Sequence, residues 1–64
     1  MQKSFVVEKY LGAAKGRNIR VIMHNGFQIS GVLRTFDDFA ILLRDNKDGE
    51  DKVIFIRQIS TIEP

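Results

Sequence analysis

Residues 25–43 read NGFQISGVLRTFDDFAILL, and this stretch decides the fold. Its first pair, Asn25-Gly26, predicts a tight hairpin turn, because both residue types tolerate a positive φ angle. From Phe27 onward the side chains alternate as they do in a strand, and Gly31 falls within that strand. A glycine there predicts a bulge or sharp bend, which lets one long strand serve both sides of a small barrel.

Further short elements lie on both sides of this stretch. Residues 4–15 predict a helix with Ser4 as N-cap, Gly16 as the stop and one apolar face formed by Val6, Val7, Tyr10, Leu11 and Ala14. From Ile19 the apolar residues recur with the period of a strand. Later strands are expected at 39–44, 52–56 and 59–62, with a polar turn at 45–51 in which Gly49 takes the positive φ angle.

These elements predict one mainly β domain over residues 1–64, with the five bent antiparallel strands at 19–62. So few residues cannot build a good two-layer sandwich, so we expect a bent sheet that closes into a small barrel. Such a barrel leaves an edge at its last two strands, where Val53 to Ile56 form an apolar, β-prone run. Pairing that edge with a neighbouring subunit, head to tail, would close a ring.

The small size of the chain points the same way. A domain of 64 residues buries only about 60% of its unfolded surface and usually needs a staple. With no Cys and one His, neither a disulfide nor a Cys/His metal site is expected to stabilise the domain. Oligomerisation is the remaining way to supply that stability. Neither a membrane-spanning apolar run nor a signal peptide is recognisable, so we expect a cytoplasmic protein with no membrane partner.

The net charge of +2 is unevenly spread. Residues 1–36 carry one acidic group, Glu8, against six basic groups: Lys3, Lys9, Lys15, Arg17, Arg20 and Arg34. A basic half can mark a phosphate-binding surface. Ordinary solvated charge is the alternative, and charge alone does not exclude it.

The order of these motifs resembles the bacterial Sm-like RNA chaperone family Hfq, in the form found in Gram-positive bacteria. The matching pieces are Asn25-Gly26-Phe27-Gln28, Gly31, Phe36-Asp37-x-Phe39, Leu42-Leu43 and Ile59-Ser60-Thr61, within residues 10–64. The resemblance implies an Sm-like (SH3-type) barrel, a six-membered ring and binding of single-stranded RNA without a cofactor. It also implies a role in pairing small RNAs with messenger RNAs.

The resemblance implies an adenine-rich RNA site on the face far from the helix, the distal face. Its residues would be Ile22, Asn25, Gly26, Phe27, Gln28, Ile29, Ser30, Ser60 and Thr61. Apolar side chains can stack or pack against bases, and Gln28 can pair with an adenine edge. The alternative is that Phe27 and Ile29 belong to the barrel core.

On the helix side, the proximal face, the resemblance implies uridine binding around a pore by Asp38, Phe39, Ile56 and Arg57. Core packing is the alternative role for Phe39. The family's usual Tyr-Lys-His-Ala is replaced here by Phe55-Ile56-Arg57-Gln58. Ile56 cannot donate a hydrogen bond to uracil, Arg57 restores a positive charge, and Phe55 lacks the hydroxyl that can bond across a subunit boundary. We therefore expect weakened uridine binding.

The family's basic rim would correspond to Lys15, Arg17 and Arg44, and the acidic turn at 45–51 is expected to weaken its attraction for RNA. The subunit contact would involve Val53, Ile54 and Phe55.

No enzyme is expected, since no nucleophile set, phosphate-cradling loop or metal-ligand cluster is present in the sequence. His24 is interpreted as a surface residue, and Asp37 as a turn residue rather than half of a carboxylate pair. Two hypotheses remain open. One is an RNA-binding ring; the other is a diverged relative that stays monomeric and acts through protein contacts or by mixing with another Hfq.

Overall fold

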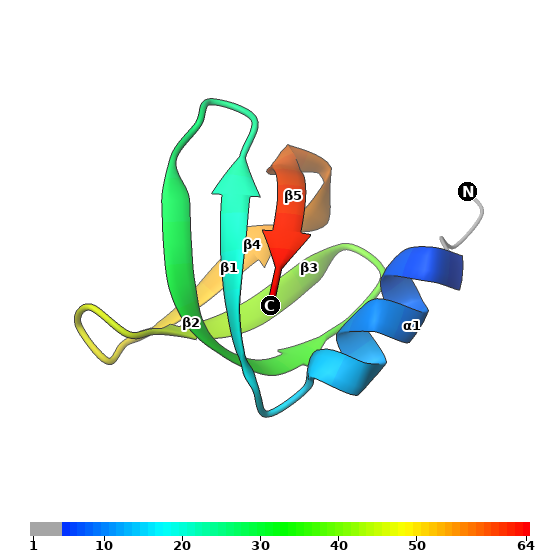
Figure 1. The fold of residues 1–64 in the computed structure, drawn as a ribbon, viewed down its shortest axis with the longest axis horizontal. Coiled ribbons are helices and arrows are strands. Elements are labelled where there is room, and N and C mark those ends of the chain that lie inside the picture. The colour runs from blue at the N-terminus through cyan, green and yellow to red at the C-terminus, as the bar shows by residue number, and fades with distance from the viewer. Residues whose placement is uncertain (1–4) are drawn as a thin grey trace.

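The computed structural model describes residues 5–64, which form one helix and five strands (Figure 1). The elements are α1 (Phe5–Ala14), β1 (Asn18–Met23), β2 (Gln28–Phe36), β3 (Ala40–Asp45), β4 (Asp51–Phe55), the 3-10 helix η1 (Ile56–Gln58) and β5 (Ile59–Glu63). The predicted helix and five strands are confirmed, with ends that shift by one or two residues. The N-cap predicted at Ser4 lies outside the described residues.

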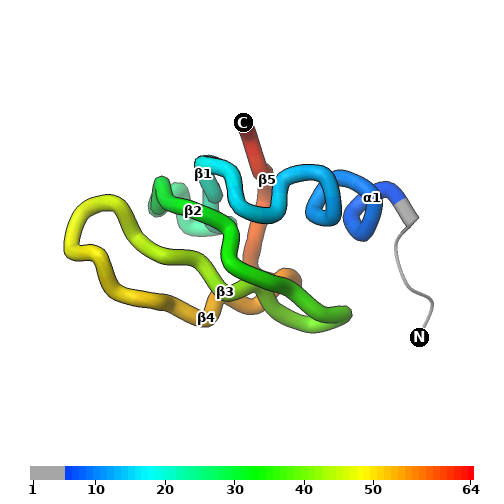
Figure 2. The backbone as a smooth tube through the Cα atoms, turned by 90° about the horizontal axis from the view of Figure 1, so that it is seen from below, coloured from blue at the N-terminus to red at the C-terminus, as the bar shows by residue number. Residues whose placement is uncertain are grey.

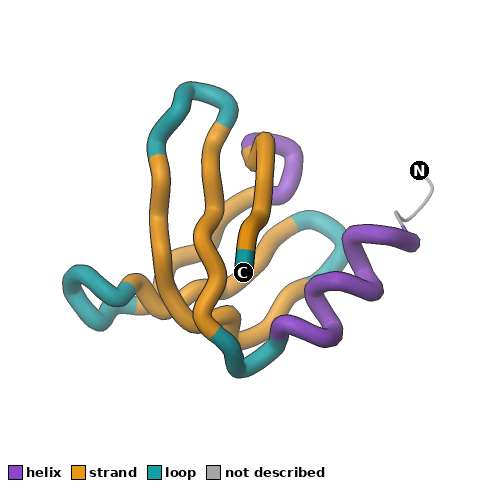
Figure 3. Tube along the Cα trace, viewed as in Figure 1, coloured by secondary structure: helices purple, strands orange, loops and turns teal. Residues whose placement is uncertain are grey.

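All neighbouring strands are antiparallel, in the order β4-β3-β2-β1-β5. Short turns join consecutive strands, and η1 carries the chain from one end of the sheet to the other (Figure 3). β4 and β5 are therefore the two edge strands, as the sequence predicted. The β3–β4 turn projects from the opposite side of the molecule to α1 (Figures 1 and 2).

The long strand β2 bends so that it can pair on both sides. It pairs with β1 up to Val32 and with β3 from Gly31 onward. A Cβ atom at Gly31 would lie 2.1 Å from the carbonyl oxygen of Arg44, so only glycine allows the two backbones to approach. The register shift itself lies between Leu33 and Thr35. The predicted irregularity is thus present, but the bulge falls at Arg34 and Gly31 provides the close contact.

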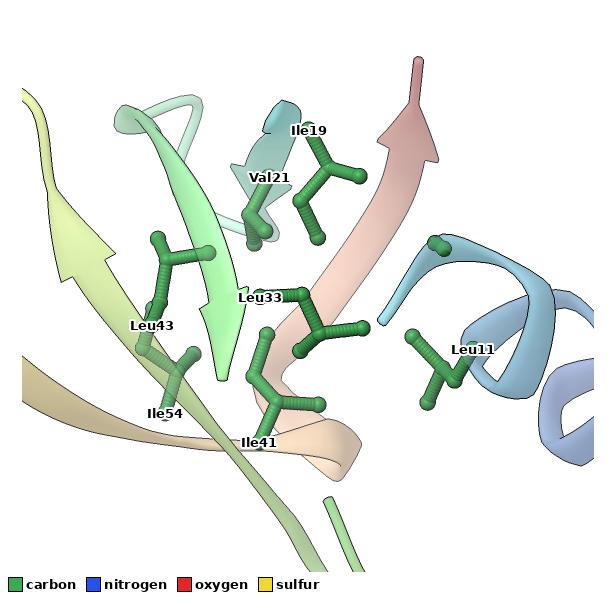
Figure 4. Packing of buried hydrophobic residues seen from close by; sticks show 8 residues of the cluster. Leu11, Ile19, Val21, Leu33, Ile41, Leu43 and Ile54 are labelled. Carbon is green, nitrogen blue, oxygen red and sulfur yellow. The ribbon is translucent and has the colours of Figure 1, made fainter. Parts of the chain in front are cut away.

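The inward side chains form one core between the bent sheet and α1 (Figure 4). Its buried members are Leu11, Ala14, Ile19, Val21, Leu33, Ile41, Leu43 and Ile54. Alternate residues of β1 and β3, one residue each of β2 and β4, and one face of α1 supply them, as the two sequence periods predict. Their burial provides the main driving force for folding.

The prediction that Val6 belongs to the apolar face of the helix was wrong. Val6 is 75% exposed, whereas Val7 and Tyr10 pack against the core. Successive helical residues turn by about 100°, and Val6 therefore falls beside the face that Val7, Leu11 and Ala14 share. Among residues 5–64, no helix is long and apolar enough to cross a membrane.

Candidate nucleic-acid interface

The turn between β1 and β2 presents an aromatic ring to solvent. Gly26 N donates to Met23 O at 2.9 Å, and Met23 N donates to Phe27 O at 2.8 Å. Asn25 Oδ1 accepts a hydrogen bond from Phe27 N at 2.9 Å. Within this turn Gly26 takes the positive φ angle, +89°, whereas Asn25 does not and acts through its side chain instead. Phe27 is 63% exposed, which excludes the alternative of a core residue.

Several predicted distal residues lie in one row across the sheet. Ile22 pairs with Gln28 on β2 and with Thr61 on β5. Gln28 and Thr61 are exposed and Ile22 is half-buried. Because side chains in the same row of a sheet point to the same face, these three form one outer surface beside the hairpin.

The remaining distal candidates differ in their placement. Ser30 is exposed, one row further along, where its strand partner Arg20 pairs with Glu63; Arg20 Nε lies 2.9 Å from Glu63 Oε1. Ser60 is exposed at the register shift between β1 and β5. Its Oγ atom lies 3.5 Å from Oγ1 of Thr61. Ile29 packs against the core, so its side chain belongs to the opposite face.

The turn before β3 exposes a second aromatic ring. Asp37 Oδ1 accepts hydrogen bonds from Phe39 N at 2.8 Å and from Ala40 N at 2.9 Å. These two amide donors lower the pKa of the Asp37 carboxyl. The predicted structural role of Asp37 is confirmed. Phe39 is 67% exposed, so its alternative role in the core is excluded.

The predicted proximal residues are brought together by the chain after β4. Ile56 N donates to Phe39 O at 2.8 Å, which fixes η1 against the turn. Ile56 is half-buried and packs against the core, whereas Arg57 and Asp38 are exposed. The surface near Phe39 therefore offers one aromatic ring, the guanidinium of Arg57, and the carboxylates of Asp38 and of the turn residue Asp37.

The predicted rim residues lie at two places. Lys15 and Arg17 are exposed in the segment between α1 and β1. Arg44 lies on β3, where its Nε atom is 3.3 Å from Asp51 Oδ1. Arg34, which was not predicted as a site residue, reaches the same oxygen at 3.7 Å.

The acidic turn at 45–51 is partly neutralised by its own lysine. Lys52 Nζ lies 2.6 Å from Asp45 Oδ2 and 2.9 Å from Asp48 Oδ2. These bonds lower the pKa of Asp45, helped by the amide of Lys47, and they raise the pKa of Lys52. For Asp48, the amide of Glu50 lowers the pKa most and Lys52 adds to it.

The predicted subunit contact divides between the two faces of β4. Val53 is 62% exposed and Phe55 is 53% exposed, whereas Ile54 is buried in the core. Ile54 can therefore take part in a subunit contact through its backbone at the free edge, but not through its side chain. Beside this edge, an open groove is lined by Met23, Ile29, Lys52, Val53, Ile54, Phe55 and Gln58.

Comparisons with known proteins identify the family. The family model described as Hfq protein matches residues 7–64. This chain belongs to the Hfq family. A relative named "RNA-binding protein Hfq" from Oceanobacillus iheyensis is 36% identical over 61 residues, which cover 92% of this chain and 80% of the relative. One of the same name from Clostridium beijerinckii is 34% identical over 65 residues, covering 98% and 78%.

The fold agrees with that membership. A crystal structure of the pleiotropic translational regulator Hfq is similar to this chain with a TM-score of 0.85 and 28% identity, covering 92% of this chain and 98% of that one. The Sm-like barrel and the resemblance to Hfq of Gram-positive bacteria are both confirmed.

The position of Arg34 beside the predicted rim residue Arg44 was not foreseen from the sequence. Arg34 was counted in the basic half of the chain, but nothing in the sequence places it beside Arg44. The bulge turns it toward Asp51, and a bulge cannot be positioned to the residue from alternation alone.

Proposed function

We propose that this Hfq-family protein binds single-stranded RNA, with adenine-rich RNA on the outer face of β1, β2 and β5. The observation that carries the proposal is the row of Gln28, Ile22 and Thr61 beside the exposed ring of Phe27. Stacking on an aromatic side chain contributes about 1–3 kcal/mol per base, and an amide can bond the adenine edge. Relatives named as RNA-binding proteins support it.

We propose that uridine binding near Phe39 is weakened. The Hfq pattern has a lysine where this chain has Ile56, whose side chain packs against the core and carries no donor. The exposed Asp38 adds a charge that repels phosphate. Arg57 offsets this charge, so some attraction for the backbone remains.

We further propose that the chain assembles into a homo-oligomeric ring, six-membered as family resemblance implies. The support is the pair of free edges, β4 and β5, together with the exposed Val53 and Phe55 next to a groove. Joining the edge of one copy to the opposite edge of the next satisfies their open backbone groups. Phe55 has no hydroxyl to strengthen that contact.

The proposed activity is that of a cytoplasmic, non-enzymatic RNA chaperone that helps small RNAs pair with messenger RNAs. It needs no cofactor in this proposal. Helix and barrel act together as one domain, because α1 contributes Leu11 and Ala14 to the core of the sheet. A ring with separate adenine and uridine faces could hold two RNA strands near one another.

Fluorescence anisotropy with oligo(A) and oligo(U) across a salt series tests the RNA-binding proposal. We expect low-micromolar or tighter binding of oligo(A), weaker binding of oligo(U), and a salt slope that reports the phosphate contacts. Absence of oligo(A) binding at low micromolar protein contradicts the proposal. Equal affinities for oligo(A) and oligo(U) with a steep salt slope would mean that attraction for phosphate, without base recognition, accounts for the binding.

The second candidate is a diverged relative that stays monomeric and acts through protein contacts. The loss of the hydroxyl at Phe55 and the extended acidic turn favour it. Light scattering behind size exclusion separates the two. A mass of 7.3 kDa at high concentration supports the monomer, and about six times that mass supports the ring.

A further inference from the structure

Two parallel rows of side chains cross the outer face of β1, β2 and β5, where β1 lies between the other two strands (Figure 1). The first row, centred on Ile22, is the one to which the proposed function assigns adenine. The second row lies two residues further along each strand and consists of Ser30, Arg20 and Glu63. Side chains two residues apart in a strand point to the same face, and the two rows are about 6.5 Å apart. This spacing allows neighbouring nucleotides of an extended strand to lie on the two rows.

The second row contains an arginine whose orientation is fixed. Arg20 Nε donates to Glu63 Oε1 at 2.9 Å, and Arg20 Nη2 donates to the same oxygen. Among residues 5–64, both contacts of Arg20 fall on one edge of the planar guanidinium, which leaves the other edge, Nη1 and the second N–H of Nη2, for a ligand. The side chains of Arg20 and Glu63 are 51% and 39% exposed, and Ser30 beside them is exposed. A base can therefore reach this row.

The charges of the second row favour a base over a phosphate. Glu63 neutralises Arg20 at close range, so the pair as a whole attracts a phosphate only weakly. The open edge of the guanidinium still presents two parallel N–H donors. Contacts with phosphates position a strand, whereas contacts with base edges distinguish one base from another. A neutral ion pair with directed donors is thus suited to the recognition of a base.

Guanine is the purine that matches these donors. Its O6 and N7 atoms are neighbouring acceptors, and a bidentate bond from arginine to this pair is the commonest specific contact in the major groove of DNA. The bases of a single strand expose the same edge. Adenine carries an N6 amino donor where guanine carries O6, so adenine offers the guanidinium one acceptor beside a repelling donor.

We propose that the row of Arg20, Glu63 and Ser30 is a guanine subsite, in which Arg20 bonds O6 and N7 of the base and Glu63 holds the guanidinium in position. This inference rests on the proposed RNA-binding function and deepens it, because it adds a subsite that selects a different base from its neighbour. Arg20 and Glu63 both lie outside the residues that the family resemblance assigns to the distal face. The ligand is single-stranded RNA in which a guanine stands next to an adenine.

Fluorescence anisotropy with three RNA probes of equal length tests the subsite. The probes are oligo(A), oligo(A) with one central guanine, and the same strand with 7-deazaguanine in place of that guanine. 7-Deazaguanine has a C–H group instead of N7 and so lacks one of the two acceptors. We expect the guanine probe to bind roughly fivefold to tenfold more tightly than oligo(A), and 7-deazaguanine to lose most of this gain. The preference should not change with salt, because the probes carry equal numbers of phosphates.

Arg20→Lys is the decisive variant, because it keeps the positive charge and replaces the planar fork by one ammonium group. It should abolish the preference for guanine and retain the affinity for oligo(A). Arg17→Lys changes an exposed arginine outside the two rows and is the matched control, which should keep the preference. Glu63→Gln removes a negative charge, so it should bind all three probes more tightly, yet with a smaller preference for guanine. An ion pair with a merely structural role would not separate these two effects.

The outcomes that overturn the inference differ from those that overturn the proposed function. If oligo(A) binds and the guanine probe binds no more tightly, the inference is wrong and the proposed function stands. The same holds if Arg20→Lys retains the full preference, since Arg20 and Glu63 then only hold β5 against β1. Failure of all three probes to bind the unsubstituted protein contradicts the proposed function, and the inference with it.

Discussion

Nζ of Lys52 lies 2.6 Å from Oδ2 of Asp45, a carboxylate that is 8% exposed at the end of β3. This ion pair, with the second bond to Asp48, holds the β3–β4 turn. We expect Lys52→Met to lower the Tm by several degrees at pH 7, because it leaves Asp45 poorly solvated and without its cation. Lys47→Met, an exposed lysine in the same turn, is the control and should leave the Tm unchanged.

The same contact gives stability a defined pH dependence. The pKa of Asp45 lies below its ordinary 3.8, so its contribution is complete above that value and is lost as the pH falls through the folded pKa. The pKa of Lys52 lies above its ordinary 10.5, so its contribution is complete below that value and is lost as the pH rises through the folded pKa. Thermal unfolding across pH should show a plateau between these limits. Lys52→Met should flatten the acid side; an unchanged acid limb would contradict the assignment.

Gly31 is the position at which we expect the largest loss of stability. A Cβ atom there meets backbone atoms of Arg44 and Asp45, which cannot rotate away as a side chain tip can. Gly31→Ala should cost about 3 kcal/mol or more and disrupt the β2–β3 pairing. Gly12→Ala is the control, since a Cβ there meets nothing within 4 Å. It lies inside α1 and should gain about 1 kcal/mol. Urea unfolding measures both changes.

Phe27 should matter for RNA and little for folding. Its ring is 63% exposed at the hairpin tip, so Phe27→Ala should leave the Tm almost unchanged. Loss of one stacked base corresponds to about 1–3 kcal/mol, which lowers oligo(A) affinity roughly fivefold to more than a hundredfold. Val6→Ala removes a comparably exposed apolar side chain on α1 and should leave oligo(A) affinity unaltered. Equal affinity of Phe27→Ala and the unsubstituted protein would remove Phe27 from the proposed site.

Ile56→Lys should restore a donor beside Phe39. The backbone bond from Ile56 N to Phe39 O keeps the two residues adjacent. Ile56 is half-buried at the edge of the core, so the longer side chain of a lysine can extend its amine to solvent on this surface, where one charged hydrogen bond contributes about 1.5–3 kcal/mol. We expect oligo(U) affinity to rise about tenfold or more, with a much smaller change for oligo(A). An equal gain for both oligomers would mean that added charge alone, rather than uridine recognition, is responsible.

Periodicity was sufficient for the elements and most of the core, because burial repeats every two residues in β1 and every three or four in α1. The position of a side chain was harder to predict where the backbone departs from regular helix or strand geometry. Phe27 continues the alternating pattern of β2, yet it belongs to the turn, where the pleat no longer decides which face a side chain takes. The family resemblance, rather than the pattern, favoured an exposed ring there.

Side-chain contacts between strands could not be predicted from the sequence for a related reason. The bulge at Arg34 and the pairing of Arg44 with Asp51 depend on register, and a shift of one residue reverses the face of every side chain. The acidic turn at 45–51 was expected to weaken the attraction of the rim for RNA. Its contacts with Lys52 could not be read from composition, because spacing alone does not say which charges meet.

The β3–β4 turn closes largely upon itself. Gly49 N donates to Asp45 O at 2.8 Å, Asp45 N donates to Glu50 O at 2.9 Å, and Glu50 N donates to Asp48 Oδ1 at 3.0 Å. It also lies on the opposite side of the molecule to α1. Asn46 ties the start of the turn to the barrel, since its N donates to Ser30 O at 2.9 Å and its Nδ2 to Asn18 Oδ1 at 2.9 Å. The tip of the turn beyond Asn46 can therefore change in length without rebuilding the barrel. The turn is a natural place for descendants of the chain to diversify, and an engineer could graft a foreign peptide there.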